Sequence, residues 1–279
     1  MNATKSKADT RYWDERRGTI RSRKGGWKVG KGVFSHGYDM MEDLVGKVSY
    51  FQVMILHATG RMPSRNLAAW VEAAFIGLSW PDARIWCNQI GALGGTLRTS
   101  VVGATVAGTL AGDSRTYGQK PLLEGMSFMQ AALQALKNGL TPKGIIANEC
   151  ARHGGKPQIM GFARPIAKGD ERVTAMEKVG KELGFTVGEH LALAYEMEEV
   201  LLDAFGESMN INGYCSAFLS DQGFTPQEAY QFCVLLVASG VTACYVDTFE
   251  RPPESFLPMR CDDIDYQGPP PRPVPLPEE

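Results

Sequence analysis

Apolar residues recur at three- or four-residue steps through most of the chain, the spacing of one face of an α-helix. The first such stripe lies between Asp39 and Thr59 and consists of Met40, Leu44, Val48, Phe51 and Ile55. The segment GRMPSRN then ends the pattern, because Pro63 has no N–H to donate and Ser64 can cap a following helix. A second stripe contains Leu67, Trp70, Val71, Ala74, Phe75 and Leu78. The pattern predicts an all-α chain with short connections.

The same period predicts further helices later in the chain. They cover Leu122–Lys137, Arg172–Leu183, Thr186–Phe205, and a segment that opens at Pro226 and breaks near Ser239–Gly240. Alternation typical of strands is limited to short pieces at Lys28–Phe34 and Met209–Ile211. The ending GPPPRPVPLPEE cannot pack as helix or strand, so residues 269–279 should form an extended Pro-rich tail. Such a tail is either solvated or wraps a partner subunit.

The segment Gly91–Gly112, GALGGTLRTSVVGATVAGTLAG, is unusual for a helix of a soluble protein. Glycine costs about 1 kcal/mol relative to alanine inside a helix, so this many small residues indicate that another backbone approaches closely. Arg98 and the threonines argue against a membrane helix with the same spacing. We interpret the segment as a helix buried at a subunit interface, with a helix inside its own core as the alternative.

Length and charge narrow the class of protein. A chain of 279 residues can form one large domain or two intimate subdomains. Its formal net charge of −2 indicates neither a nucleic-acid binder nor a membrane-surface protein. The charge is uneven, because ten Lys or Arg and only three acidic residues lie within the first 31 residues. This basic N-terminal arm, residues 1–32, is interpreted as solvated and partly ordered, with a polyanionic ligand as the alternative.

The six cysteines include no CxxC pair, and most have apolar neighbours, which favours reduced thiols over disulfides or a zinc site. The four histidines are dispersed, so no metal site is expected. The N-terminus contains no apolar h-region, and the longest apolar run, Val101–Ala111, is shorter than a spanning helix. These observations predict a soluble cytoplasmic protein without a membrane partner.

Four segments together resemble the citrate synthase superfamily. They are SHGYDMMEDLVGKVSYFQVMILHATGRMPS, IMGFARPIAKGDERV, NINGYCSAFLSDQGFTPQEAY and DDIDYQGPPPR, in this order. The first resembles the family's opening helices, the second its glycine-histidine-arginine loop, and the third the segment of its asparagine-valine-aspartate motif. The resemblance covers roughly residues 10–272, and it is nearest to citryl-CoA lyases and the C-terminal module of ATP-citrate lyase.

This resemblance implies an all-α, citrate synthase-like fold with large and small helical subdomains in an intertwined homodimer or higher even oligomer. We expect the large subdomain to comprise residues 33–157 and 220–268, and the small one residues 158–219 with the substrate loop. Family members make or break a C–C bond next to a CoA thioester. A carboxylate removes a proton, and histidines stabilise the enolate and polarise the ketone. Coenzyme A is therefore expected as the acyl-CoA substrate, and no metal is expected.

The positions of the family's proton-handling residues carry other side chains here. Tyr117 occupies the place of one histidine and Ala163 that of another, 46 residues apart as the family's spacing requires. Asn212 occupies the place of the catalytic aspartate, and Trp80 that of a substrate-binding histidine. An asparagine cannot accept a proton near neutral pH, whereas a phenol can donate a hydrogen bond to an oxyanion. The resemblance thus implies a retained scaffold with altered chemistry.

Other binding positions are kept. The resemblance implies CoA-binding residues in the loop at Gly161, Phe162, Arg164 and Lys168. Arg172 occupies the place of an arginine that grips a substrate carboxylate, or it is an ordinary helix-start arginine in an ion pair. Either Arg251 or Arg260 matches the arginine donated by the partner subunit. A further carboxylate-binding arginine is replaced by Val237.

Histidines at unrelated positions offer replacement chemistry. His36 and His153 are the two expected near loops that face the site, whereas His57 is expected in the core and His190 at a structural helix start. Asp113 and Glu124 are further candidate bases. The sequence predicts an enzyme that acts on a CoA thioester with an acyl group bulkier and less carboxylated than citrate, by a retro-aldol or retro-Claisen route. The alternative is a non-catalytic acyl-CoA-binding subunit or a partner subunit of a related lyase or synthase.

Overall fold

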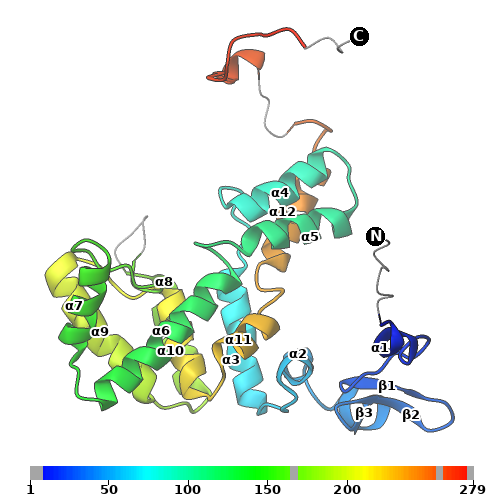
Figure 1. The fold of residues 1–279 in the computed structure, drawn as a ribbon, viewed down its shortest axis with the longest axis horizontal. Helices are drawn as coiled ribbons and strands as arrows, with labels where there is room; N and C mark the ends of the chain where they lie inside the picture. Colours follow the sequence, from blue (N-terminus) through cyan, green and yellow to red (C-terminus); the bar gives the residue numbers. More distant parts are fainter. Residues whose placement is uncertain (1–8, 164–168, 256–259, 275–279) are drawn as a thin grey trace, which may run out of the picture. The chain divides into compact units, whose positions relative to one another are not determined.

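The computed structural model of the protein describes residues 9–163, 169–255 and 260–274, and helices dominate it (Figure 1). The predicted all-α class is confirmed. Contacts divide the chain into two compact units, unit 1 with Met1–Leu78 and Ser114–Leu236, and unit 2 with Ser79–Asp113 and Val237–Glu279. These bounds differ from the predicted large subdomain (33–157 and 220–268) and small subdomain (158–219), which stay a prediction about the assembled protein.

Unit 1 begins with a short helix α1 (Arg11–Asp14) and a small antiparallel sheet. Strand β1 (Gly25–Lys28) pairs with β2 (Gly32–Ser35), and β2 pairs with β3 (Tyr38–Asp39). The predicted strand piece Lys28–Phe34 is therefore a hairpin, since Gly30 adopts a positive φ of 71° in its turn. A π-helical turn, η1 (Met40–Leu44), follows and is capped by the side chain of Asp39.

The remaining elements of unit 1 are helices, and α6, α8 and α9 among them pack against α10. They are α2 (Tyr50–Thr59), α3 (Arg65–Leu78), α6 (Gln119–Lys137), α7 (Pro142–Arg152), α8 (Glu171–Glu182), α9 (Glu189–Phe205), α10 (Ile211–Asp221) and α11 (Pro226–Phe232). Helix α10 is small or apolar on all sides and is buried along most of its length, as such helices are. Phe218 of α10 stacks on Trp70 of α3 with ring centroids 3.8 Å apart. Truncating such a buried ring costs about 3–5 kcal/mol, so this contact anchors the core.

The predicted stripe from Asp39 to Thr59 is not one helix. Gly46 has a positive φ of 74°, and Ser49 starts α2 with a capping box that it shares with Gln52. The apolar period continues through the break, because Leu44 and Ile55 both face the interior. Periodicity alone therefore could not reveal where the helix starts.

Unit 2 contains α4 (Trp86–Thr96), α5 (Val101–Gly112), α12 (Ala238–Phe249) and a 3₁₀ turn η2 (Cys261–Asp263). Helix α12 packs against both α4 and α5. A Cβ atom at Gly91 would lie 2.9 Å from the Val241 side chain, and one at Gly108 would lie 2.7 Å from the carbonyl oxygen of Cys87. The small residues thus allow the close approach that the sequence predicted, but the approaching helix belongs to the same chain.

The predicted single helix Gly91–Gly112 is also interrupted. Arg98 adopts a left-handed φ of 57°, and Ser100 caps α5 by accepting a hydrogen bond from the N–H of Gly103. The face of α5 that points away from α12 is exposed, with Val102, Val106 and Leu110 as its large apolar residues. An interface with another subunit stays a prediction for this outer face.

Two other expectations about elements were wrong. Met209–Ile211 is not a strand, because Asn210 caps α10 there with its side chain. The predicted break near Ser239–Gly240 lies earlier, between the end of α11 and the start of α12. Gly240 instead lies inside α12, where its lack of a side chain lets the backbone of Ser79 approach, and the hydroxyl oxygen of Ser79 accepts its N–H.

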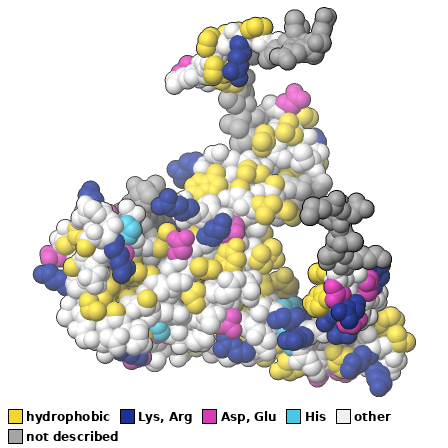
Figure 2. Space-filling view, in the orientation of Figure 1, with side chains coloured by type: hydrophobic (Ala, Val, Ile, Leu, Met, Phe, Trp, Pro, Cys, Tyr) yellow, Lys and Arg dark blue, Asp and Glu magenta, His cyan; other side chains and the backbone are white. Residues whose placement is uncertain are grey.

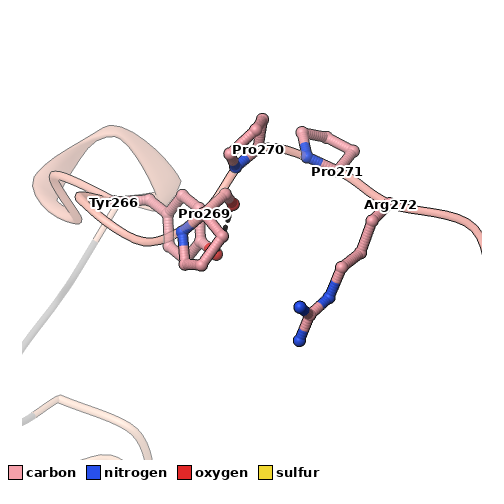
Figure 3. Close-up of a pocket in the computed structure, with 5 residues that line it drawn as sticks. All are labelled: Tyr266, Pro269, Pro270, Pro271 and Arg272. Atoms are coloured by element: carbon pink, nitrogen blue, oxygen red, sulfur yellow. Dashed lines mark hydrogen bonds between the residues drawn. The ribbon is translucent and has the colours of Figure 1, made fainter.

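The C-terminal tail forms no helix or strand over its described residues beyond η2. Tyr266 folds back to donate a hydrogen bond of 2.9 Å to the carbonyl oxygen of Pro269, and a shallow hollow forms beside Arg272 (Figure 3). The tail residues alone line this hollow, so it gives no indication of a catalytic site. Among the described helices, none has the length and apolar character needed to cross a bilayer.

Candidate functional site

The loop that the resemblance assigns to the substrate meets the start of α10 in unit 1. Asn210 donates its backbone N–H to the carbonyl oxygen of Gly161 at 2.9 Å and its side-chain amide to that of Ala163 at 2.6 Å. Gly161 has a positive φ of 99°, and a Cβ on it would lie 2.5 Å from the Cα of Gly213. The crossing therefore requires glycine on both sides, and it fixes the backbone of Gly161 and Ala163 where the resemblance expects substrate.

A single buried carboxylate starts two helices at this point. Asp170 accepts the backbone N–H of Arg172 at 3.1 Å at the start of α8 and that of Ile211 at 2.9 Å at the start of α10. Both N–H groups belong to first helical turns, which have no acceptor within their own helix. The negative charge also complements the positive ends of the two helix dipoles.

Arg172, the predicted carboxylate anchor, pairs with this same Asp170. Its Nε and Nη2 atoms donate to the two carboxylate oxygens at 2.8 and 2.7 Å. Burial by itself raises the pKa of Asp170, but the hydrogen bonds from Arg172 and from the N–H of Ile211 outweigh it, so the pKa is lowered. A substrate carboxylate at Arg172 would have to share the guanidinium with an internal partner.

Asn212 is the residue that the sequence resemblance puts at the place of a catalytic aspartate. Its side-chain amide donates to the carbonyl oxygen of Pro121 in the first turn of α6 at 2.9 Å. Tyr117 lies just before that helix, where its carbonyl oxygen accepts the N–H of Ser114. The structure thus places Asn212 against the first turn of the helix that Tyr117 precedes, with the asparagine acting as a donor to the backbone.

Two polar side chains near α6 were not anticipated from the sequence. Gln119 is buried and donates to the carbonyl oxygen of Val234, but its Oε1 has no hydrogen-bond partner within the described residues. The hydroxyl of Ser216 on α10 also lacks one there, and it lies close to Gly125 of α6. Each polar residue interrupts an otherwise apolar or small-residue helix face, which is the signal that could have found them.

The two candidate histidines, His36 and His153, lie in separate places. His36 adopts a left-handed φ of 49° beside the sheet and stacks on His57 with ring centroids 5.8 Å apart. Burial, with the nearby charges of Lys24 and His57, lowers the pKa of His36. His57 is exposed at the end of α2, so the expectation of a core histidine was wrong. His153 ends α7, and its Nε2 lies 3.5 Å from the carboxylate of Glu149. No hydrogen bond among the described residues joins either candidate, His36 or His153, to Asn212.

His190 agrees with its expected structural role. Its Nδ1 lies 2.9 Å from a carboxylate oxygen of Asp221, which also accepts the backbone N–H groups of His190 and Leu191. Asp221 of α10 thereby starts α9, and the helix begins at Glu189 rather than at the predicted Thr186.

Three predicted substrate-binding residues belong to unit 2. The carbonyl oxygen of Trp80 accepts a hydrogen bond from Asn88, and its ring is partly exposed. Arg251 is exposed at the end of α12 and pairs with Asp247 at 2.6 Å. Arg260 is exposed, and its backbone N–H donates to Asp263. Each residue is accessible within its own unit, and their roles stay predictions.

The remaining predicted positions concern CoA. Phe162 is buried in the core of unit 1, so any contact it makes with a cofactor would come from its backbone. Arg164 and Lys168 lie outside the described residues.

Burial raises the pKa of Cys215 on α10 to about 12, which keeps this thiol protonated and non-nucleophilic. Within the described ranges, no group of three or more His, Cys, Asp or Glu is arranged to hold a metal.

Comparison with known proteins identifies the fold. No family model matches the chain, and no curated protein matches its sequence. Among solved structures, a citryl-CoA lyase from Hydrogenobacter thermophilus superposes with a TM-score of 0.76 at 22% identity, over 92% of this chain and 97% of that one.

Two further structures share less of their length with the chain. An ATP citrate lyase from Methanothrix soehngenii, solved with citrate and coenzyme A, gives a TM-score of 0.72 at 15% identity over 96% of this chain and 45% of its own. A citrate synthase from Thermoplasma acidophilum gives 0.61 at 16% identity over 81% of this chain and 58% of its own. The chain therefore has the fold of the citrate synthase superfamily, as its ordered motifs predicted.

Proposed function

We propose that this protein is a divergent enzyme of the citryl-CoA lyase type. It makes or breaks a C–C bond in a CoA thioester whose acyl group is bulkier and less carboxylated than citrate. The observation that carries this proposal is a fold shared over nearly the whole of a citryl-CoA lyase, with Asn212 donating to a backbone carbonyl at the acid's place. A neutral amide cannot serve as the base, so cleavage of citryl-CoA by the family's route is not the proposed reaction.

The proposed reaction is of the retro-aldol or retro-Claisen type. In a retro-aldol cleavage, a base takes the proton of the β-hydroxyl group, the C–C bond breaks, and the thioester leaves as an enolate that is then protonated. The enolate oxygen needs a hydrogen-bond donor, and we assign the phenol of Tyr117 to that role. His36 and His153 are the proposed proton-handling groups.

The proposed binding residues hold the two ends of the substrate. The backbone at Gly161 and Phe162, with Arg164 and Lys168, would cradle CoA. The small side chain of Ala163 would leave space for the acyl group, and the indole ring of Trp80 would give that space an apolar wall. Arg172 would hold a remaining carboxylate.

An arginine near the end of the chain completes this pocket. Arg251 or Arg260 would hold the substrate from the partner subunit. The exposed pair between Arg251 and Asp247 supports Arg251, because a substrate carboxylate could replace Asp247 at little cost.

A second function is favoured by one feature of the site. Asp170 occupies two nitrogens of Arg172, and Asn212 is tied to Pro121, so both family positions serve the scaffold. A non-catalytic acyl-CoA-binding subunit, or a partner subunit of a related lyase or synthase, would need the scaffold that these contacts stabilise but no catalytic side chains. Under this alternative the protein would bind CoA without turning it over.

We also propose a homodimer formed through the outer face of α5. Val102, Val106 and Leu110 expose an apolar stripe on this helix, and small residues already bind its inner face to α12. Covering such a stripe by the same stripe of a second copy would remove apolar surface from water at about 25 cal/mol per Å².

The test is turnover of a panel of β-hydroxyacyl- and β-ketoacyl-CoA thioesters by the purified full chain, followed by mass spectrometry of the CoA products. We expect at least one non-citryl substrate to be cleaved. Replacing Tyr117→Phe should lower kcat about 100-fold, as loss of one oxyanion donor does. The matched control is Tyr50→Phe, because Tyr50 is an exposed tyrosine on α2 and should leave kcat unchanged.

Binding measurements separate the two functions. Tight CoA binding by calorimetry without turnover of any thioester would support the binding subunit and contradict the enzyme. A chain that neither binds CoA nor turns over a thioester would overturn both. Equal activity of the Tyr117→Phe and Tyr50→Phe variants would remove Tyr117 from the reaction.

A further inference from the structure

The basic arm carries five cations that form no ion pair among the described residues. Residues 16–38 contain no Asp or Glu, and the unpaired cations of this stretch are Arg21, Arg23, Lys24, Lys28 and Lys31. All five are exposed, and none takes part in an ion pair among the described residues. Lys and Arg gather over this part of the molecule, at the lower right of Figure 2. The stretch from Arg21 to Lys31 therefore presents an excess of positive charge, whereas the acidic residues of the arm, Asp9, Asp14 and Glu15, all precede it.

The same arm exposes large apolar side chains between its charges. Trp27 lies next to Lys28 on β1 and is 70% exposed, and Val29 in the adjoining turn is 78% exposed. Trp13 of α1 is 69% exposed. Tryptophan side chains next to cations are typical of protein interaction surfaces, because the ring supplies apolar contact area and the cations attract an acidic partner. β1 is also an edge strand of its sheet, open to a partner on one side.

Helix α9 exposes the opposite charge. Glu196, Glu199 and Asp203 are spaced so that they share one face of the helix, and all three are exposed. None of them forms an ion pair within the described part of the chain, and like charges at this spacing destabilise a helix by a few tenths of a kcal/mol each. Leu202 and Phe205 expose apolar surface beside the acidic residues. This acidic face of α9 matches the arm in both charge and apolar content.

We infer that the basic arm of one copy docks on the acidic face of α9 of a second copy. Opposite charges across such a contact steer association and fix its register. Residues 1–32 hold ten Lys or Arg and three acidic residues, so the rest of the chain has a net charge of −9. That remainder would repel a nucleic acid but attract another copy's arm, which favours a protein partner.

The arm does not use the α9 helix of its own chain for this purpose. It is held to its own unit through the sheet and through Lys24, whose Nζ donates to the carbonyl oxygen of His57 at 3.3 Å. No hydrogen bond or ion pair among the described residues links the arm to α9. The contact is thus available between copies, and it is separate from the apolar face of α5.

The test is self-association of the full chain, measured by sedimentation velocity at low and high salt. The variants are an arm reversal (R21E, R23E, K28E) and an α9 reversal (E196K, E199K, D203K). Each should weaken the salt-sensitive association about tenfold or more at low salt, because screening removes surface charge attraction. An equimolar mixture of the two variants should restore it, since each arm then meets a face of opposite charge. The control is R115E, because Arg115 is an exposed cation that belongs to neither the arm nor α9, and it should associate like the parent.

Zero-length carbodiimide crosslinking of isotope-mixed protein gives a direct readout, with an expected link between Lys28 of one copy and Glu199 of another. Rescue in the mixture together with this link would establish the contact. Three results would overturn it. The arm reversal could associate as strongly as the parent, or the mixture could fail to restore association although both variants keep their helical circular dichroism. The third is that the arm binds a single-stranded oligonucleotide while its reversal leaves self-association unchanged. Loss of the α5 contact alone would leave the salt-sensitive step intact.

Discussion

Arg98 shows how one side chain can hold a helix end in unit 2. Its Nη1 donates to the carbonyl oxygens of Gly95 at 3.1 Å, Thr248 at 3.4 Å and Phe249, and its Nη2 donates to that of Arg251 at 2.5 Å. Three of these carbonyls belong to the last turn of α12 or the residues after it, where the helix offers them no N–H donor. The positive charge also suits the negative end of the helix dipole.

The Arg98→Ala variant should therefore lower the free energy of unfolding by about 2 kcal/mol, because hydrogen bonds from a charged donor are lost and carbonyls are left unpaired. Chemical denaturation measured by circular dichroism tests this. Arg84→Ala is the control, since Arg84 forms an exposed pair with Asp82 and should change stability by less than about 1 kcal/mol. Equal effects of the two substitutions would show that Arg98 does not cap α12.

At the scale of elements, Asp170 joins the starts of α8 and α10, and its role predicts a pH dependence. The pKa of Asp170 is lower in the folded chain than the ordinary value of about 3.9 for aspartate. Its stabilisation is therefore complete above that ordinary value and is lost as the pH falls through the lower folded-state pKa. Asp170→Asn should cost about 3 kcal/mol near neutral pH, because it removes the buried carboxylate charge that accepts two hydrogen bonds from the Arg172 guanidinium.

Unfolding curves recorded between neutral and acidic pH check this expectation. The difference in stability between the parent and Asp170→Asn should shrink as the solution becomes acidic. Asp203→Asn, on the exposed face of α9, should show neither the loss nor the convergence. A constant difference at all pH values would mean that the carboxylate charge of Asp170 contributes nothing.

Helix positions could be predicted from periodicity, but helix ends could not. The break between α4 and α5 depends on a left-handed Arg98, a conformation that L-residues seldom adopt and that no sequence pattern announces. The start of α9 depends on Asp221, which is 31 residues away from His190 along the chain. Both ends are set by tertiary contacts, whereas the apolar stripes that predicted the helices are local.

The candidate site was predictable to a similar extent. The resemblance marked the segments around Gly161 and Asn212 as site residues, but it did not predict their crossing. That crossing depends on hydrogen bonds from Asn210 to Gly161 and Ala163, which lie more than 40 residues earlier in the chain. The pairing of Arg172 with Asp170 was foreseen only as an alternative to substrate binding. Gln119 and Ser216 were missed: each interrupts an apolar or small-residue helix face, but only the neighbouring helices show that its polar atom is buried.

At the scale of the whole molecule, four motifs predicted the fold although each is weak alone, because all four occur in the order expected for the same fold. The proposed dimer belongs to this scale. Val106→Asp on the outer face of α5 should place a charge in the interface and raise the dissociation constant of the dimer about 30-fold or more. Light scattering after gel filtration over a range of concentrations measures this change.

The control for the dimer is Ile76→Asp, because Ile76 is an exposed apolar residue of α3 outside the proposed interface. It should leave the mass of the particle unchanged. A monomeric parent, or a Val106→Asp variant that dimerises as well as the parent, would contradict the proposal. High salt should leave this apolar association intact, which distinguishes it from docking of the basic arm.

The shared cap of α8 and α10 has a consequence for how this chain can vary. Residues that touch only substrate can be exchanged one at a time, but Asp170 supports two helices, and it lies 41 residues before Ile211, the first residue of the second. Opening one helix removes a partner from the other, so the two should fray as one cooperative unit. The scaffold thus constrains Asp170 more tightly than any group that would touch substrate.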